Sequence, residues 1–211
     1  MPKKEVPLQQ LAQYLPDHTY EPVVAYLNHY KVHLTIAKSR GSVLGDYRHK
    51  IDTKNHRISV NGNLNKYAFL ITLLHELAHL VTFEKFGNKI QAHGKEWKNI
   101  YSQILAQFIE QKIFPSDIEQ ELLRTLRNPG ASTCSEESLQ RILYRYDVRK
   151  NGYQLIEDLP AGAFFKIKDG RIFKKGNKRT KRYVCVEQET NRAYLFSAIH
   201  EVLLLETPGQ E

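Results

Sequence analysis

Two histidines and a glutamate are spaced so that all three could act on one metal ion. The letters HELAH stand at residues 75–79, inside the long apolar stretch 65–86. If that stretch is helical, side chains four residues apart point the same way, so both imidazoles can hold one zinc ion. Glu76 follows His75 by about 100° around the helix axis and can reach a water on that metal as a general base.

A structural interpretation of these residues must be weighed against the metal site. In it, the imidazoles bond backbone carbonyls and Glu76 pairs with a lysine. The surrounding helix is apolar almost all round, with Leu73, Leu74 and Leu77 beside the motif. Burying a carboxylate and two imidazoles without partners costs several kcal/mol, and a metal with its water satisfies all three groups. The pattern therefore favours a metal site.

A catalytic zinc ion needs a third protein ligand and one open position. Thr82 and Lys85 occupy the positions where metzincins place glycine and histidine, and no aspartate follows the motif before residue 117. Glu96 lies 17 residues after the second histidine but lacks the preceding Asn-Glu pair typical of gluzincins. His93 lies 14 residues after that histidine, at the head of the next expected helix, and Gly94 lets the backbone pass close by.

The combination of HELAH, the 14-residue gap and HGKEW resembles the SprT-like, or Spartan-like, zinc metalloproteases. The upstream segment SRGSVLGDYR resembles the Arg-rich, Leu-Gly segment of that family, and the resemblance covers roughly residues 15–110. It implies His75, His79 and His93 as zinc ligands and Glu76 as the catalytic base. It also implies a zincin-like α+β core in which an extended peptide lies along a sheet edge.

The elements that must position these residues follow from the hydrophobic pattern. Two short helices are expected in the first thirty residues, and three strands in residues 31–62 suggest a small antiparallel sheet. Helices should follow over about 65–86, 94–111, 115–127 and, after a Thr133–Glu136 capping box, up to about Tyr146. Short β-like runs begin after residue 152. The predicted class is α+β: a zincin-like core over 1–128, a helical connector over 129–150 and a small β-rich C-terminal module over 151–211.

The positive charge of the chain is concentrated in that module. The formal net charge is +8, and nine cations with a single acid lie between residues 166 and 182. Phe164, Phe165, Phe173 and Tyr183 lie among them, so phosphate contacts and base stacking could bind single-stranded DNA or RNA. The alternative is a solvated hairpin with apolar residues facing inward. The nine candidate nucleic-acid-binding residues are Lys166, Lys168, Arg171, Lys174, Lys175, Lys178, Arg179, Lys181 and Arg182.

Other residues with reactive side chains carry weaker signals. Trp97 belongs to HGKEW and is expected to anchor the core, while Tyr47 is a candidate for stabilising an oxyanion. Cys134 and Cys185 are expected to be packing residues. With only two cysteines, the module lacks the four-cysteine zinc ribbon that many SprT-like proteins carry.

The leading hypothesis is a zinc-dependent endopeptidase of the SprT-like type, with DNA-associated or DNA-crosslinked proteins as candidate substrates. The alternative is a nucleic-acid-associated binding protein whose zincin core is structural or weakly active. A metal-dependent nuclease is disfavoured because the region lacks clustered carboxylates. With no secretory signal and no membrane-spanning stretch, we expect the bacterial cytoplasm or the nucleoid, and no membrane partner.

Overall fold

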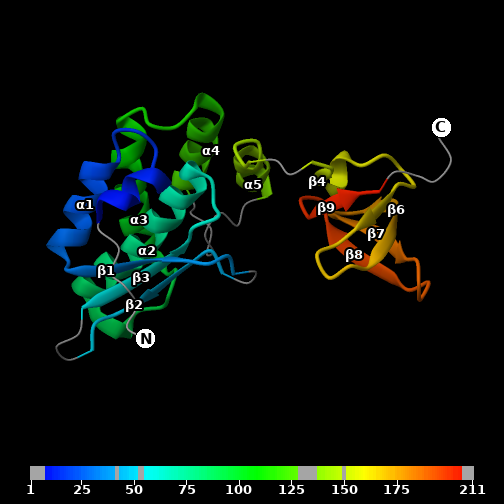
Figure 1. Ribbon diagram of the computed structural model, residues 1–211. Coiled ribbons are helices and arrows are strands. Elements are labelled where there is room, and N and C mark those ends of the chain that lie inside the picture. Colours follow the sequence, from blue (N-terminus) through cyan, green and yellow to red (C-terminus); the bar gives the residue numbers. More distant parts are fainter. Residues whose placement is uncertain (1–7, 41–42, 52–54, 128–136, 149–150, 206–211) are drawn as a thin grey trace, which may run out of the picture. The chain divides into compact units, whose positions relative to one another are not determined.

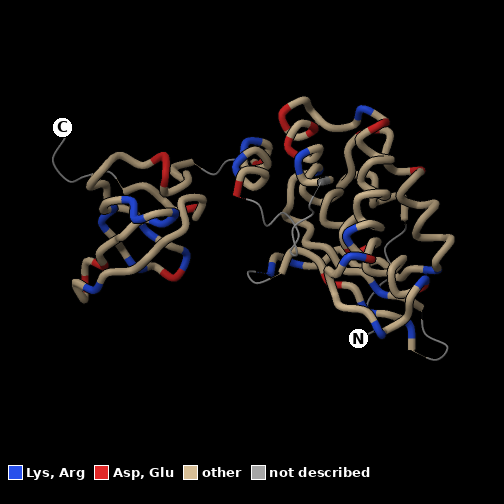
Figure 2. Tube along the Cα trace, turned by 180° about the vertical axis from the view of Figure 1, so that it is seen from behind, with Lys and Arg blue, Asp and Glu red and all other residues tan. Residues whose placement is uncertain are grey.

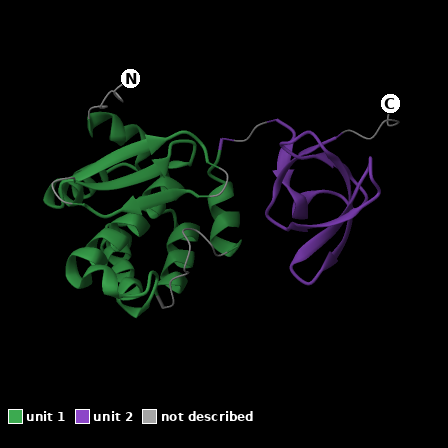
Figure 3. Ribbon diagram, turned by 90° about the horizontal axis from the view of Figure 1, so that it is seen from below, with its two compact units in different colours: residues 1–147 green, residues 148–211 purple. Residues whose placement is uncertain are grey.

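The computed structural model divides into two compact units, residues 1–147 and 148–211 (Figure 3). No described helix has both the length and the apolar composition needed to cross a membrane. The residues that the structure describes are 8–40, 43–51, 55–127, 137–148 and 151–205.

The first unit is an α+β structure in which helices pack on a three-stranded sheet (Figure 1). The first of the two expected N-terminal helices is a 3₁₀ helix, and the other elements lie where the hydrophobic pattern predicts them. Their bounds are η1 Leu8–Tyr14, α1 Tyr20–His29, β1 Val32–Ala37, β2 Gly45–Arg48, β3 His56–Asn61, α2 Lys66–Phe86, η2 Gly87–Lys89, α3 Lys95–Glu110, α4 Ser116–Arg127 and α5 Glu137–Tyr144.

The sheet is mixed, which corrects the expected antiparallel arrangement. Its strand order is β1-β3-β2, with β1 parallel to β3 and β2 antiparallel to β3. The strand richest in buried side chains, β3, takes the centre, where it has a ladder partner on both sides. The Asn61 side-chain amide at its end donates to the carbonyls of Arg40 and Val43 at 3.2 and 3.0 Å, which anchors the connection from β1 to β2 there.

Helix α2 is the centre of this unit. It contacts β2 and β3 on one side and α3 on the other, and fourteen of its 21 residues are buried. The side chain of Asn65 caps the start of the helix by accepting a hydrogen bond from the Ala68 amide at 2.9 Å. Gly87 follows the last turn with a φ of 69°, a conformation that suits glycine. The predicted burial of this helix is therefore observed.

Helix α5 packs on the first unit. Leu139 and Leu143 are buried in the same core as α2, and the Asn65 amide also donates to the carbonyl of Leu143. The helix expected within the connector therefore lies against α4. The capping box at Thr133 and Glu136, like Cys134, falls outside the described residues.

The second unit is a six-stranded sheet with the order β4-β9-β5-β6-β7-β8, and every described strand pair is antiparallel. Its core contains Phe165, Phe173, Cys185 and Val202, all fully buried. This agrees with the expected β-rich module. The elements are β4 Tyr153–Leu155, η3 Ile156–Asp158, β5 Phe164–Lys166, β6 Ile172–Arg179, β7 Arg182–Glu187, β8 Ala193–Ser197 and β9 Glu201–Leu204.

Candidate metal centre

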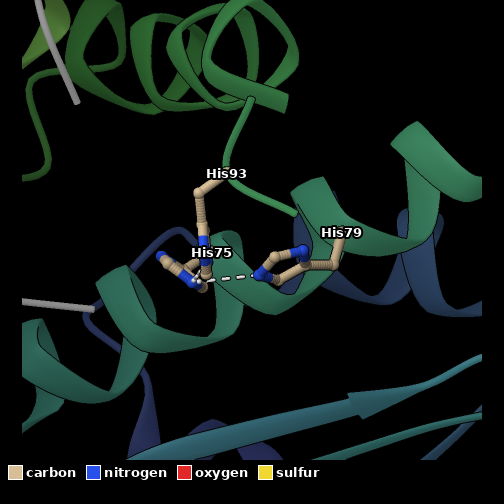
Figure 4. Close-up of side chains that lie close together, drawn as sticks. All are labelled: His75, His79 and His93. Atoms are coloured by element: carbon tan, nitrogen blue, oxygen red, sulfur yellow. Dashed lines mark hydrogen bonds between the residues drawn. The ribbon is translucent and has the colours of Figure 1, made fainter. Parts of the chain in front are cut away.

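Three histidines converge on one point in the first unit (Figure 4). The Nε2 atom of His75 lies 3.2 Å from Nε2 of His93 and 3.2 Å from Nε2 of His79. One ligand atom from each residue lies within 4.8 Å of the other two. These are the three residues that the sequence pattern and the family resemblance single out.

Two separate elements bring these imidazoles together. His75 and His79 lie one turn apart on α2, as the four-residue spacing predicts. His93 comes from the segment between α2 and α3, just before the first turn of α3, with a φ of 60°. The Gly94 amide closes the turn there by donating to the Gln91 carbonyl at 3.0 Å. This turn aims the third imidazole back at α2.

The geometry fits a tetrahedral metal ion. Zinc bonds imidazole nitrogen at about 2.0–2.1 Å, so two ligands of a tetrahedral ion lie about 3.3 Å apart. The two separations that involve His75 are both 3.2 Å and match that value, and the third pair of ligand atoms lies within 4.8 Å. A neutral imidazole nitrogen can make one hydrogen bond, yet Nε2 of His75 faces two other nitrogens. A divalent cation satisfies all three lone pairs at once.

The environment keeps the three imidazoles neutral, which is the form that binds metals. Burial, together with the nearby His79 and His93, lowers the pKa of His75 to about 2. Burial and the neighbouring His93 lower the pKa of His79 to about 4, and burial also lowers the pKa of His93.

Trp97 forms one wall of the site. It is 1% exposed, and its ring centroid lies 4.6, 5.3 and 4.7 Å from those of His75, His79 and His93. Tyr101 stacks on Trp97 at 5.0 Å. The expected role as a core anchor is observed. Sequence reasoning missed the contact with all three imidazoles, although the spacing of four residues from His93 was a signal.

Glu76 lies beside the histidines on the side of α2 that faces strand β2. It is 5% exposed, and a Cβ atom on Gly45 would lie 2.6 Å from its Oε1 atom. A larger side chain at residue 45 would therefore displace the Glu76 carboxylate, which sequence reasoning did not predict, although the Leu-Gly pair was part of the resemblance. Burial, aided by the nearby Asp46 and opposed by Arg40, raises the pKa of Glu76 to about 8. Within the described ranges no lysine or arginine forms an ion pair with Glu76, so the structural interpretation lacks its expected partner.

Tyr47 lies next to the second histidine. Its ring is parallel to that of His79 within 2°, at 6.4 Å between centroids. Its hydroxyl lies 2.9 Å from Nδ1 of His56. Burial and the nearby Glu84 carboxylate raise the pKa of the phenol. The residue named as a candidate oxyanion group is thus close to the site, but its hydroxyl is bonded to another side chain.

The basic segment of the second unit is only partly available to a ligand. Lys175 is 7% exposed, and its ammonium donates to the carbonyls of Leu159 and Glu157 at 2.6 and 3.2 Å. Its inclusion among the candidate binding residues is therefore wrong. The physical reason is alternation along β6, since Lys175 lies two residues after the buried Phe173 and shares its face. Arg171 is paired with Asp169 and Glu187.

The remaining seven cations are exposed. Figure 2 shows where lysines and arginines lie along the Cα trace. In the described parts of the chain none of the seven cations lies within ion-pair distance of an acidic side chain. They are Lys166, Lys168, Lys174, Lys178, Arg179, Lys181 and Arg182, and we call them the exposed cations.

The aromatic residues among these cations mostly serve the core. Phe165 and Phe173 are fully buried and stack on each other at 5.6 Å, so they are not available for base stacking. Phe164 and Tyr183 are half-buried, and each lies beside a lysine ammonium. The hairpin therefore combines an apolar inner face with cations outside, as the alternative interpretation predicted. Cys185 is fully buried in the same core, in agreement with a packing role.

Comparison with known proteins places the chain in a family. The model of the SprT-like family matches residues 9–119, slightly more than half of the 211 residues, so the chain belongs to the SprT-like family. The match includes both α2 and His93. No solved structure matches the chain.

Curated relatives match over short segments. Protein SprT of Pseudomonas entomophila is 62% identical over 29 residues, which are 14% of this chain and 18% of that protein. Protein SprT of Pseudomonas putida is 59% identical over 29 residues, with the same shares. Protein SprT of Glaesserella parasuis is 52% identical over 31 residues, 15% of this chain and 19% of that protein. The matches thus span less than a fifth of each relative's length.

Proposed function

We propose that this protein is a zinc-dependent endopeptidase of the SprT type. The observation that carries the proposal is the convergence of three neutral imidazoles on one point, two of their nitrogen separations at the tetrahedral value, beside a buried carboxylate. A purely structural metal site has no use for Glu76, whose burial is unfavourable when it is charged. Membership of the SprT-like family supports the same function.

His75, His79 and His93 would hold the ion, and Glu76 would move the proton. When bound, zinc supplies Lewis acidity that polarises a peptide carbonyl and makes a water more acidic. Glu76 would take the proton of that water and later give it to the leaving amine. Gly45 leaves room for the carboxylate, and burial limits its motion. A nearby cation would lower the pKa of Glu76 from about 8, so that the carboxylate is ionised near neutral pH.

The test compares zinc content and peptide cleavage across three variants and the wild type. The His93→Ala variant should lose most of its zinc together with its activity. Glu76→Gln should keep about one zinc per chain and lose cleavage. Glu96→Gln is the matched control, since it removes the rival glutamate ligand from the first turn of α3, and it should change neither quantity. Cleavage that survives in Glu76→Gln would show that Glu76 is not the base.

A second part of the proposal concerns the substrate. The exposed cations would contact phosphates, because they have no acidic partners of their own among the described residues. Each such contact releases a counterion condensed on the DNA, which favours binding. DNA-associated or DNA-crosslinked proteins would then be brought to the metal centre, and the protein would act in the bacterial cytoplasm at the nucleoid. Cleavage of one protein substrate should rise when DNA is added. Equal rates with and without DNA would contradict this part alone.

The alternative function is a nucleic-acid-associated binding protein with a structural or weakly active core. The exposed cations support this alternative, because binding of DNA by the second unit would not require catalysis at the metal centre. The two functions separate in one comparison. If the wild type binds zinc and DNA but, like Glu76→Gln, cleaves no peptide, the protein is the binding protein rather than the endopeptidase.

A further inference from the structure

Three side chains from three elements form a chain of contacts that ends at a metal ligand. Tyr47 of β2 lies against the ring of His79, and its hydroxyl lies 2.9 Å from Nδ1 of His56 on β3. Nε2 of His56 lies 3.2 Å from Oε1 of Glu84 on α2. The same carboxylate oxygen lies 2.9 Å from the Lys50 ammonium. We call the contact series formed by Tyr47, His56 and Glu84 the Tyr47–His56–Glu84 chain.

The protons of this chain have one favourable arrangement. His56 is 2% exposed, and burial lowers its pKa against the opposing effect of the Glu84 carboxylate, which favours the neutral imidazole with a single N–H. The negative Glu84 carboxylate lies 3.2 Å from Nε2 of His56 and favours the tautomer with the hydrogen on that nitrogen, although the contact is not aligned as a hydrogen bond. Nδ1 is then an acceptor, and the Tyr47 hydroxyl must donate to it. The Glu84 carboxylate therefore favours one tautomer of His56 and one direction for the Tyr47 hydrogen bond.

The backbone holds the chain in place. Tyr47 pairs with Ile58 across the β2–β3 ladder, so His56, two residues before Ile58, lies diagonally on the same face of the sheet. That face is covered by α2, where Glu84 lies five residues after His79. One helix thus supplies both the metal ligand and the carboxylate that orients its neighbour.

His79 is held from two sides. Trp97 of α3 contacts all three imidazoles, whereas Tyr47 contacts His79 from the side of the sheet. Parallel rings at 6.4 Å lie within the range of offset aromatic contacts. Groups that orient a ligating imidazole raise metal affinity, because the ligand loses less freedom when the metal binds.

We propose that the Tyr47–His56–Glu84 chain positions the His79 imidazole for metal binding. Tyr47, His56 and Glu84 are positioning residues, and none of them needs to touch the substrate. The inference rests on the proposed function insofar as it requires a metal at the three histidines. It adds residues outside HELAH and HGKEW that set how tightly the metal is held.

The experiment measures the affinity of the 211-residue protein for Co²⁺ and Zn²⁺ by competition with a chromogenic chelator. Removing a group that orients a ligand weakens metal affinity by about 10–100-fold, and we expect the lower end for Glu84→Ala. Tyr47→Phe keeps the ring and removes the hydroxyl, so its loss should be smaller. Glu84→Gln keeps a side-chain oxygen beside Nε2 of His56 and should therefore retain most of the affinity.

Arg48→Ala is the matched control. Arg48 is the next residue on β2, its side chain is 67% exposed, and its partner Asp46 lies outside the chain of contacts. It should leave the affinity unchanged. All measurements are made well below the unfolding temperature of each variant, and the visible spectrum of bound Co²⁺ reports the ligand geometry independently of affinity. If Glu84→Ala does not fold, Tyr47→Phe decides the question.

A double variant separates positioning from general stability. If the three residues act as one chain, Tyr47→Phe adds little to the loss already caused by Glu84→Ala. Wild-type affinity and an unchanged Co²⁺ spectrum in both single variants would overturn the inference while leaving the proposed function intact. A wild type that binds no Co²⁺ or Zn²⁺ would overturn both.

Discussion

The two units place their polar groups in opposite ways. In the first unit, three histidines and a glutamate lie on or beside a buried helix, within a core of leucine and aromatic side chains. In the second, the seven exposed cations lie on the outside of a small β-sheet, and Lys175, the one buried lysine among its described residues, is bonded to backbone carbonyls. Metal chemistry needs fixed distances, which a packed core provides, whereas attraction of phosphates acts over several ångströms and tolerates mobile side chains. We therefore expect the two units to respond differently to the same treatment.

Removal of metal should give the largest contrast between the units. A chelator should reduce peptide cleavage to the background rate, because Glu76 has no acidified water to work on. Nucleic-acid affinity, measured by fluorescence anisotropy, should change less than about twofold, since the described residues of the second unit offer no cluster of metal ligands. Equal loss of both activities would show that the cations depend on the metal centre.

The next largest effect is expected from Gly45→Ala. The added Cβ would meet the Glu76 carboxylate at 2.6 Å and Thr72 at 2.8 Å, so the carboxylate must move. Displacement of a reacting group by about 1 Å can reduce the rate about 100-fold. The kcat for a peptide substrate should fall by that order, while zinc content stays at the wild-type value. Unchanged kcat would mean that the position of Glu76 is not critical.

Neighbouring lysines on β6 provide a matched pair for the second unit. Lys174→Ala should weaken DNA binding and lower the slope of log affinity against log salt by about 1, as expected for one lost phosphate contact. Lys175→Ala should instead lower the free energy of unfolding by about 1–3 kcal/mol, because one buried and one partly buried carbonyl lose their donor. Salt titrations and urea denaturation distinguish the two variants. A reduced salt slope in Lys175→Ala would contradict its structural role.

The smallest expected effect concerns the pH dependence of stability in the metal-free protein. The lowered pKa values of His75 and His79 mean that the unfolded chain binds more protons than the native chain below about pH 6.5. The free energy of unfolding should therefore fall as the pH falls below that value. Glu76 acts in the opposite sense, because its pKa is raised from 4.5 to about 8 and the native state keeps a proton that unfolding releases. The contribution of Glu76 to the free energy of unfolding therefore falls as the pH rises from 4.5 to about 8.

The Glu76→Gln variant isolates the two contributions. With chelator present, it should lose the fall in stability between about pH 6.5 and 8 and keep the fall on the acid side. Urea denaturation at about pH 5, 6.5 and 8 measures both limbs. Identical pH profiles for variant and wild type would show that the carboxyl group of Glu76 is not responsible.

Much of the metal centre could be predicted because helical periodicity is local. Residues four apart on a helix are neighbours whatever the rest of the chain does, so His75 and His79 follow from spacing alone. His93 needed more, since elimination of rival ligands and resemblance to the SprT-like family indicated it. The strands were also predicted from alternation, and alternation from Phe173 contained the signal that Lys175 lies inside.

The tertiary structure decided what no local pattern carries. Strand order was one such feature. Strand β3 takes the centre because its buried side chains pack against segments that lie far away in the sequence. The approach of Gly45 to Glu76 was another, as was the contact chain from Tyr47 to Glu84, since each depends on how β2 packs across α2. The sequence by itself therefore determined which side chains could bind a metal and where the charge lies. Packing between distant segments decided which neighbours hold those side chains. The free energy of burial depends on the surface that the whole fold removes from water, and no single segment sets it.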